Sequence, residues 1–302
     1  MPIWGQVLTE IATSDDPIIH DKTRRKYRKH LHSITGRHTI IYYTNWLTNE
    51  DPASTQSGMT LSDMQGFMGA VNGQNTDELD LILHVPGGEL GTAQAIVQYL
   101  RAKFTHIRAI VPVAAMSAGT MVALACDEIV MGAHSYLGPI DPQLPLGGRL
   151  VPVGSVIDDF VRASEQIAQD PEMYRVWSPI LDKYPPGLLS DCAQAQRRTK
   201  RVAKEWLAAW MLSGDDDAAH CAAEWFADDQ EHMSHIRPIS RDEARQQRIV
   251  ITDLEEDPAL QDAVLSVHHA TMHSLTGAPM VKIIENHLGG SDHTYMVMRV
   301  PD

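Results

Sequence analysis

The segment from Leu81 to Pro142 constrains the fold of this 302-residue chain more than any other feature. It contains two short apolar runs, Leu81–Val85 and Ile107–Val113, whose lengths are typical of buried strands. Apolar residues between the runs recur at helical spacing, and small residues that begin another helix follow the second run. Repeated strand–helix–strand units imply right-handed crossovers, so the segment predicts an α/β fold with a mostly parallel sheet.

The same segment has the hydropathy of a membrane helix, because Ala109–Cys126 contains no charged residue. Pro112 and the step Ser117–Gly119 divide this run into strand, turn and helix. Parallel strands that are buried on both faces also read as continuous apolar runs. We therefore predict no membrane span here.

A glycine pair follows the first strand, and a serine follows the second. Gly87 and Gly88 come directly after Val85-Pro86, and Ala115-Met-Ser117-Ala-Gly119 differs from the G-x-S-x-G elbow only in its first residue. Free backbone N–H groups at such strand ends suit a nucleophile beside an oxyanion hole. The alternative reading is structural: the glycines form a turn and the serine caps a helix.

These motifs, together with Leu137-Gly-Pro-Ile-Asp-Pro142, resemble the serine peptidases of the ClpP/crotonase superfamily. They are most similar to its signal-peptide-peptidase-like branch, the serine dehydrogenase proteinases. Further stretches similar to that branch are Tyr27–Leu31, Thr35–Arg37, His232–His235 and Lys282–Asn286. The resemblance implies repeated ββα units with outer helices. It also implies that Ser117 is the nucleophile and that the amides of Gly87 or Gly88 and of Ala118 form the oxyanion hole.

The general base is the least defined part of the predicted site. ClpP carries a histidine about 25 residues after its serine, but the region 137–142 of this chain has none. The resemblance then favours a Ser-Lys dyad with Lys183, which precedes a long predicted helix. A lysine can act as a base only where its pKa falls towards neutral.

Other residues are weaker candidates for the base. Lys200 and Lys204 lie within the long helix and read as solvated charges. His134 is the alternative base. The non-catalytic interpretation is that His134 is only a surface residue of its loop. Asp141 is expected to support the site by orienting its loop or pairing with an arginine.

The predicted reaction is acyl transfer on an extended polypeptide substrate by a serine endopeptidase, without metal or cofactor. Two alternatives stay open. One is a crotonase-like acyl-CoA enzyme, which a basic patch near the Gly-Gly helix would favour. The other is a non-catalytic scaffold that kept the fold, which an exposed Lys183 with no other base near Ser117 would favour.

The predicted organisation is an N-terminal helical arm (residues 1–37), a catalytic core (38–213) and a C-terminal extension (214–302). Both outer segments carry apolar residues at helical spacing. Burial against a neighbouring subunit would explain them, so we expect a homo-oligomer, with packing on the chain's own core as the alternative.

Composition excludes several classes of partner. A net charge of −14 argues against nonspecific nucleic-acid binding and against docking on anionic lipid. Three scattered cysteines and the lack of a signal-peptide pattern predict a reducing, cytoplasmic location. His232 and His235 raise the possibility of a metal site, but no further ligands complete one, so capping or packing is expected.

Overall fold

The computed structural model describes residues 4–47, 57–277, 280–290 and 294–298. Its main sheet has seven strands in the order β10-β5-β3-β2-β1-β11-β12. The five strands from β10 to β1 run parallel, and β11 and β12 continue the sheet antiparallel. Along this order the strands span Ile251–Asp253, Glu128–Met131, His106–Val111, Glu78–His84, His38–Thr44, Met280–Asn286 and Thr294–Met298. The predicted α/β fold with a mostly parallel sheet is confirmed.

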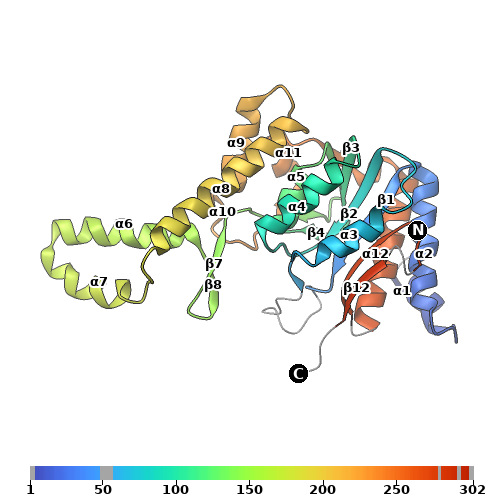
Figure 1. Cartoon of the computed structure of the whole chain (residues 1–302), viewed down its shortest axis with the longest axis horizontal. Coiled ribbons are helices and arrows are strands. Elements are labelled where there is room, and N and C mark those ends of the chain that lie inside the picture. Colours follow the sequence, from blue (N-terminus) through green and yellow to red (C-terminus); the bar gives the residue numbers. More distant parts are fainter. Residues whose placement is uncertain (1–3, 48–56, 278–279, 291–293, 299–302) are drawn as a thin grey trace.

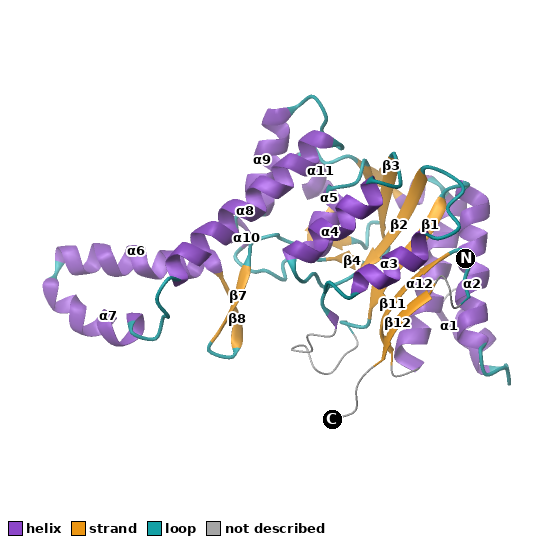
Figure 2. Cartoon of the chain, in the orientation of Figure 1, coloured by secondary structure: helices purple, strands orange, loops and turns teal. Residues whose placement is uncertain are grey.

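The central strands are apolar on both faces because helices cover both sides of the sheet. In β1, Ile40 and Tyr42 point into one apolar core, and Ile41 and Tyr43 point into the other. The first face is covered by α3 (Asp63–Val71), α4 (Leu90–Arg101) and α5 (Ala118–Leu124), and the second by α1 (Trp4–Ala12), α2 (Ile19–Thr35) and α12 (Pro258–Gly277), as Figures 1 and 2 show.

Ala109–Cys126 follows the predicted division into strand, turn and helix. It comprises the end of β3, the short strand β4 (Ala114–Ala115) and α5. No helix among the described residues is long and apolar enough to cross a membrane.

A second, three-stranded sheet lies beside the main one and has the order β4-β6-β9. β6 (Tyr136–Leu137) runs parallel to β4, and β9 (Ile239–Ser240) runs antiparallel to β6. An isolated bridge between Val85 and Ala115 joins this small sheet to the end of β2. The segments that carry Gly87, Ser117 and Asp141 therefore meet at one place.

An arm projects from this body (Figure 1). It consists of the hairpin β7–β8 (Gln143–Leu146 and Arg149–Pro152), α6 (Val153–Gln169), the 3-10 turn η2 (Pro171–Met173), α7 (Tyr174–Leu181) and the start of α8 (Leu188–Ala209). Its own apolar cluster is small, with Val153, Val156 and Cys192 as the buried members. After it come α9 (Asp216–Phe226), α10 (Asp229–His232), α11 (Arg241–Gln246) and the 3-10 turn η3 (Leu254–Glu256).

The two outer segments pack on the chain's own core. Val7 and Ile11 of α1 are buried in the same cluster as α12, and β11 and β12 complete the main sheet next to β1. The apolar faces predicted to bury against a neighbour are thus covered in part within the chain, while Trp4 and Leu8 of α1 stay exposed. Large exposed apolar side chains also lie along the arm, at Leu150, Val161, Tyr174, Val176 and Ile180.

Candidate active site

The backbone of Gly87 lies directly against Ser117. A Cβ placed on Gly87 would sit 2.6 Å from Ser117 Cβ and 3.1 Å from the backbone nitrogen of Ala118. Gly87 and Gly88 have φ angles of 110° and 146°, which L side chains rarely adopt. The glycine pair is therefore required both for its conformation and for its close approach to the serine.

Ser117 has the strained backbone expected of a nucleophile elbow. Its φ of 50° and ψ of −118° lie outside the usual regions for a residue with a side chain. The turn forms because Met116 N–H donates to Val85 O (3.0 Å) before the chain enters α5. Met116 and Ala118 are buried, whereas Ser117 is partly exposed, so the turn presents the hydroxyl at the surface.

Two backbone amides in the segments next to Ser117 have no backbone hydrogen-bond partner in the described part of the chain. Ala118 N–H begins α5 and Gly88 N–H follows the strained Gly87; neither donates a backbone hydrogen bond. Such free donors are what an oxyanion hole needs. The proximity of Gly87 to Ala118 N fits the predicted pairing of these amides, although the roles of the individual donors stay predictions.

The loop after β6 is attached to the same turn. Thr120 Oγ1 donates to Ala115 O (2.8 Å) and accepts from Gly138 N–H (3.0 Å). A Cβ on Gly138 would lie 2.4 Å from the end of the Met116 side chain and 3.3 Å from Met116 Cα, so Gly138 packs closely against the residue before Ser117. The attachment brings the predicted supporting residue, Asp141, to the serine end of the small sheet.

Asp141 pairs with a histidine and not with an arginine. His235 Nδ1 lies 2.7 Å from Asp141 Oδ1, and Gln143 Nε2 donates to Asp141 Oδ2 at 2.5 Å. The carboxylate is buried while the imidazole is partly exposed. An ionised carboxylate can only accept, so Nδ1 carries a proton, and in the neutral ring Nε2 is then the acceptor atom. A catalytic aspartate holds its histidine in the same way.

The topology puts this pair at the serine end of the small sheet. β4 ends just before Ser117, and the parallel strand β6 ends just before the loop to Asp141. β9 runs antiparallel to β6, so His235 precedes β9 at that same end. The structure shows no hydrogen bond between His235 and Ser117, and such bonds are often long or absent before substrate binds.

His235 is a candidate site residue that the sequence interpretation does not include. The sequence contains two indications of this residue: His235 lies in a stretch similar to the serine dehydrogenase proteinases, and Asp141 has no assigned partner. The sequence does not connect the two residues, because they are 94 positions apart. Only the pairing of β6 with β9 brings them together.

His232 anchors the segment that carries His235. It is buried, donates from Nε2–H to Trp225 O (2.8 Å), and lies edge-on to the Trp225 ring. Burial lowers the pKa of His232, which favours the neutral ring. Burial together with the nearby Asp141 carboxylate raises the pKa of Asp229. The expected packing role of His232 fits these contacts.

The predicted lysine base is on the arm. Lys183 is exposed in the turn between α7 and α8, which Figure 1 shows projecting away from α5. Within one chain the structure does not bring Lys183 and Ser117 together, so the dyad stays a prediction. Lys200 and Lys204 bind Glu224 and Asp216 of α9, as expected for solvated helix charges.

The alternative base, His134, lies at the other end of the small sheet. It is exposed and comes just before β6, whereas Ser117 comes just after the parallel strand β4. Its ring is next to Gly132, on the side of Glu255. The structure thus separates His134 from the serine.

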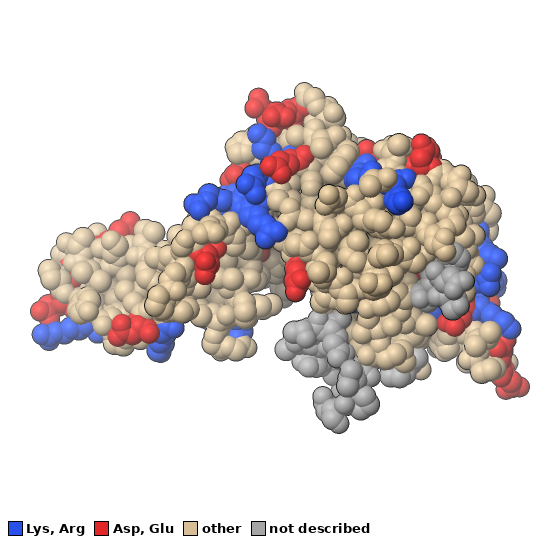
Figure 3. Space-filling view, viewed as in Figure 1, with Lys and Arg blue, Asp and Glu red and all other residues tan. Residues whose placement is uncertain are grey.

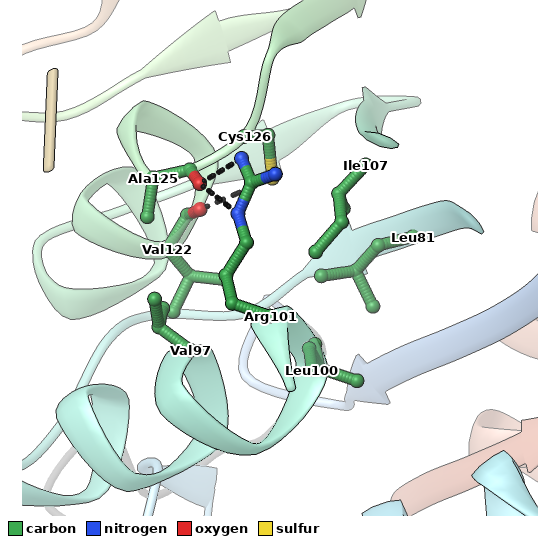
Figure 4. A pocket seen from close by; sticks show the side chains of 8 residues that line it. All are labelled: Leu81, Val97, Leu100, Arg101, Ile107, Val122, Ala125 and Cys126. Atoms are coloured by element: carbon green, nitrogen blue, oxygen red, sulfur yellow. Dashed lines mark hydrogen bonds between the residues drawn. The ribbon is translucent and has the colours of Figure 1, made fainter. Parts of the chain in front are cut away.

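No group of three histidine, cysteine or acidic side chains among the described residues could hold a metal ion. A cavity of about 10 Å³ between α4 and β3 is lined by Arg101, Cys126 and six apolar or small residues (Figure 4). It is too small for a ligand, and Arg101 closes it by donating to Ala125 O.

Comparison with known proteins assigns part of the chain to a family. Residues 57–173 match the family described as ClpP-like SDH-type serine proteinase. This match confirms, for about two fifths of the chain, the resemblance seen in the glycine and serine motifs, and the fold is ClpP-like. The segment includes Gly87, Ser117 and Asp141, and it ends before Lys183 and His235.

Similar proteins are known over parts of the chain. Two uncharacterized proteins of Methanocaldococcus jannaschii are 42% identical over 87 residues and 32% identical over 113 residues. These matches cover 28% and 37% of this chain and 30% and 37% of the relatives, so the chain spans about a third of the length of the curated relatives that it matches.

Two solved structures share part of the architecture. Both are mutants of the 1510-N membrane-bound stomatin-specific protease, and one is in complex with a substrate peptide. The TM-scores are 0.39 and 0.40 at 17% identity, with 66% and 65% of this chain and 77% and 71% of those chains covered.

Proposed function

We propose that this chain is a serine endopeptidase that acts on extended polypeptides through an acyl-enzyme. The observation that carries the proposal is the contact between Gly87 and the strained Ser117 turn. A strained backbone is retained only where the surrounding structure holds it, and strain of this kind clusters at active sites. The family match over residues 57–173 supports the same reaction.

We assign the general base to His235, oriented by Asp141. In this mechanism Ser117 Oγ attacks the scissile carbonyl while His235 Nε2 takes the hydroxyl proton and then gives it to the leaving amine. The amides of Gly88 and Ala118 stabilise the oxyanion. Water then hydrolyses the acyl-enzyme with the same histidine as base. Lys183 remains the alternative base, acting from a neighbouring subunit if the predicted homo-oligomer brings the arm over Ser117.

Labelling with a fluorophosphonate tests the nucleophile. We expect one covalent adduct on Ser117, located by mass spectrometry, and none in Ser117→Ala, which should remain folded because it loses only one hydroxyl. Cleavage of an unstructured protein should also disappear in Ser117→Ala. Lack of an adduct in the folded wild-type protein would favour the scaffold alternative.

We also propose that this protein acts in the cytoplasm.

An acyl-CoA enzyme is the second candidate, because the structure brings a basic side chain to the glycine helix. Arg198 of α8 hydrogen-bonds to Gln94 of α4, and basic residues gather over α8 in Figure 3. A crotonase-like enzyme uses the oxyanion hole without a serine nucleophile. Turnover of an acyl-CoA thioester by Ser117→Ala would support that candidate, and its absence would leave the peptidase.

A further inference from the structure

A buried ion pair holds the segment that pairs with Gly88. Lys282 of β11 and Asp63 of α3 are 1% and 0% exposed. Lys282 Nζ lies 2.8 Å from both carboxylate oxygens of Asp63 and donates to Gly58 O at 2.7 Å. These three bonds use all three donors of the ammonium. Lys282 therefore has no donor or lone pair left for chemistry at Ser117.

The ion pair forms hydrogen bonds to the backbone on both sides of Met59. Lys282 holds Gly58 O, and Asp63 Oδ2 accepts Thr60 N–H at 3.0 Å. Tyr42 OH also donates to Asp63 Oδ2 at 2.5 Å, which ties the carboxylate to β1. Met59 itself is 1% exposed. The segment 58–60 is thus fixed to the main sheet by side chains on each side of one residue.

Met59 is the strand partner of the glycine pair. Its N–H donates to Gly87 O at 2.7 Å, and its carbonyl accepts from Glu89 N–H at 3.1 Å. A trans peptide is planar, with the carbonyl of one residue pointing opposite to the N–H of the next. With Gly87 O directed at Met59, Gly88 N–H must point away from Met59. The bond from Met59 consequently sets the direction of the Gly88 amide.

We propose that Lys282 and Asp63 are positioning residues that aim the Gly88 amide at the oxyanion, acting through Met59. The inference rests on the proposed peptidase function. Gly87 and Gly88 both have positive φ and carry no side chain that could hold the peptide between them in one orientation. The orientation of this peptide therefore depends on its strand partner, Met59. Removing the pair frees the 58–60 segment and lets the Gly87–Gly88 peptide rotate. Because an oxyanion donor acts in the transition state, the loss should fall on kcat more than on KM.

The test replaces the pair by apolar residues, Lys282→Met with Asp63→Leu, so that no unpaired charge is left buried. A matched control exists at the opposite end of α4. There Arg101 donates to Ala125 O and lies 2.8 Å from Asp127, whose Oδ2 accepts Ile107 N–H (Figure 4 shows Arg101 and Ala125). The control variant is Arg101→Met with Asp127→Leu. It removes the same kinds of bond without touching Met59.

Three quantities are measured on each protein: the folded fraction by circular dichroism, kcat and KM on an unstructured protein, and the rate constant for fluorophosphonate labelling of Ser117. For the Lys282/Asp63 variant we expect kcat and the labelling rate to fall about 100-fold with KM changed less than about threefold. The pH profile should keep its wild-type midpoint, because the base is unaltered. The control should keep wild-type rates.

Wild-type rates in a folded Lys282/Asp63 variant would overturn the inference, as would equal losses in the control. If the double variant does not fold, Tyr42→Phe removes one bond to Asp63 and should lower kcat about threefold to tenfold at unchanged KM; a wild-type kcat there would also overturn it. A wild-type protein whose Ser117 is not labelled would overturn the proposed function itself, and the inference with it.

Discussion

The serine end of the sheets and the projecting arm are built in opposite ways. Around Ser117 the backbone of three segments is packed so closely that added Cβ atoms on Gly87, Gly88 or Gly119 would lie within 2.6 Å of a neighbour. In the arm, Gly187 also has a positive φ of 87°, yet nothing lies within 4 Å of its Cβ position. Exposed apolar side chains line the arm, whereas the strand residues beneath Ser117 are buried. The tight packing around Ser117 suits chemistry, which needs a rigid backbone. The exposed apolar surface of the arm suits contact.

The largest expected effect distinguishes the two candidate bases, one in each region. His235→Gln should lower kcat by about 10³ to 10⁴-fold, because it removes the proton acceptor held by Asp141. Lys183→Ala should change kcat less than about twofold, since its ammonium is exposed on the arm. Steady-state cleavage of an unstructured protein measures both. The reverse result, a large loss in Lys183→Ala alone, would restore the Ser-Lys dyad.

The next largest effect is expected when two glycines with positive φ, Gly87 at the site and Gly187 in the arm, are each replaced by alanine. Gly87→Ala should lower the labelling rate of Ser117 by about 10² to 10³-fold, because its methyl group would displace Ser117 or Ala118 N. Gly187→Ala meets no neighbour and should cost only about 1 kcal/mol of unfolding free energy for its strained φ. Fluorophosphonate labelling and thermal unfolding of both variants test this. Equal labelling would contradict the tight packing at the site.

Lowering the pH should destabilise the part of the protein that contains the sheets, and should affect the arm less. Burial lowers the pKa of His84 to about 4 and also lowers that of His268, whereas residues 143–209, which comprise the arm and the rest of α8, contain no histidine. Between the unfolded value of 6.5 and about pH 4, the unfolded chain binds a proton that folded His84 does not bind, so stability falls as pH falls. His84 alone should contribute about 1.4 kcal/mol per pH unit.

Chemical denaturation at pH 7 and pH 5, followed for wild type and His84→Leu, checks this contribution. The variant should show a shallower loss of unfolding free energy towards acid. An unchanged slope would mean that His84 is protonated in the folded protein.

The smallest effect on chemistry is expected at the tip of the arm. Val176→Ser should change the unfolding free energy by no more than about 0.5 kcal/mol and leave Ser117 labelling intact, because Val176 is exposed. Light scattering gives the second readout. We predict a homo-oligomer for the wild type, and a smaller assembly for this variant if the arm forms the contact. A monomeric wild type with full activity would contradict the predicted assembly.

Much of the fold could be predicted from local pattern. The apolar runs before Gly87 and Ser117 became β2 and β3, and the charge-free segment divided at Pro112 and Ser117 as expected. The glycine and serine motifs could be identified because their chemistry depends on residues next to each other in the chain. The candidate base depends on more than such a local pattern. The resemblance to the Ser-Lys branch favours Lys183, which precedes a helix, but the start of that helix belongs to the arm.

What the sequence determined by itself is the class of fold and the turns at Gly87 and Ser117, since hydrophobic periodicity and the conformational freedom of glycine act over a few residues. Only the tertiary structure decided which titratable groups meet. Asp141 reaches His235 through the pairing of β6 with β9, and Lys282 reaches Asp63 through the antiparallel addition of β11 to β1. These contacts span 94 and 219 positions. Strand pairing over such distances is set by burial of whole faces, which no local pattern records.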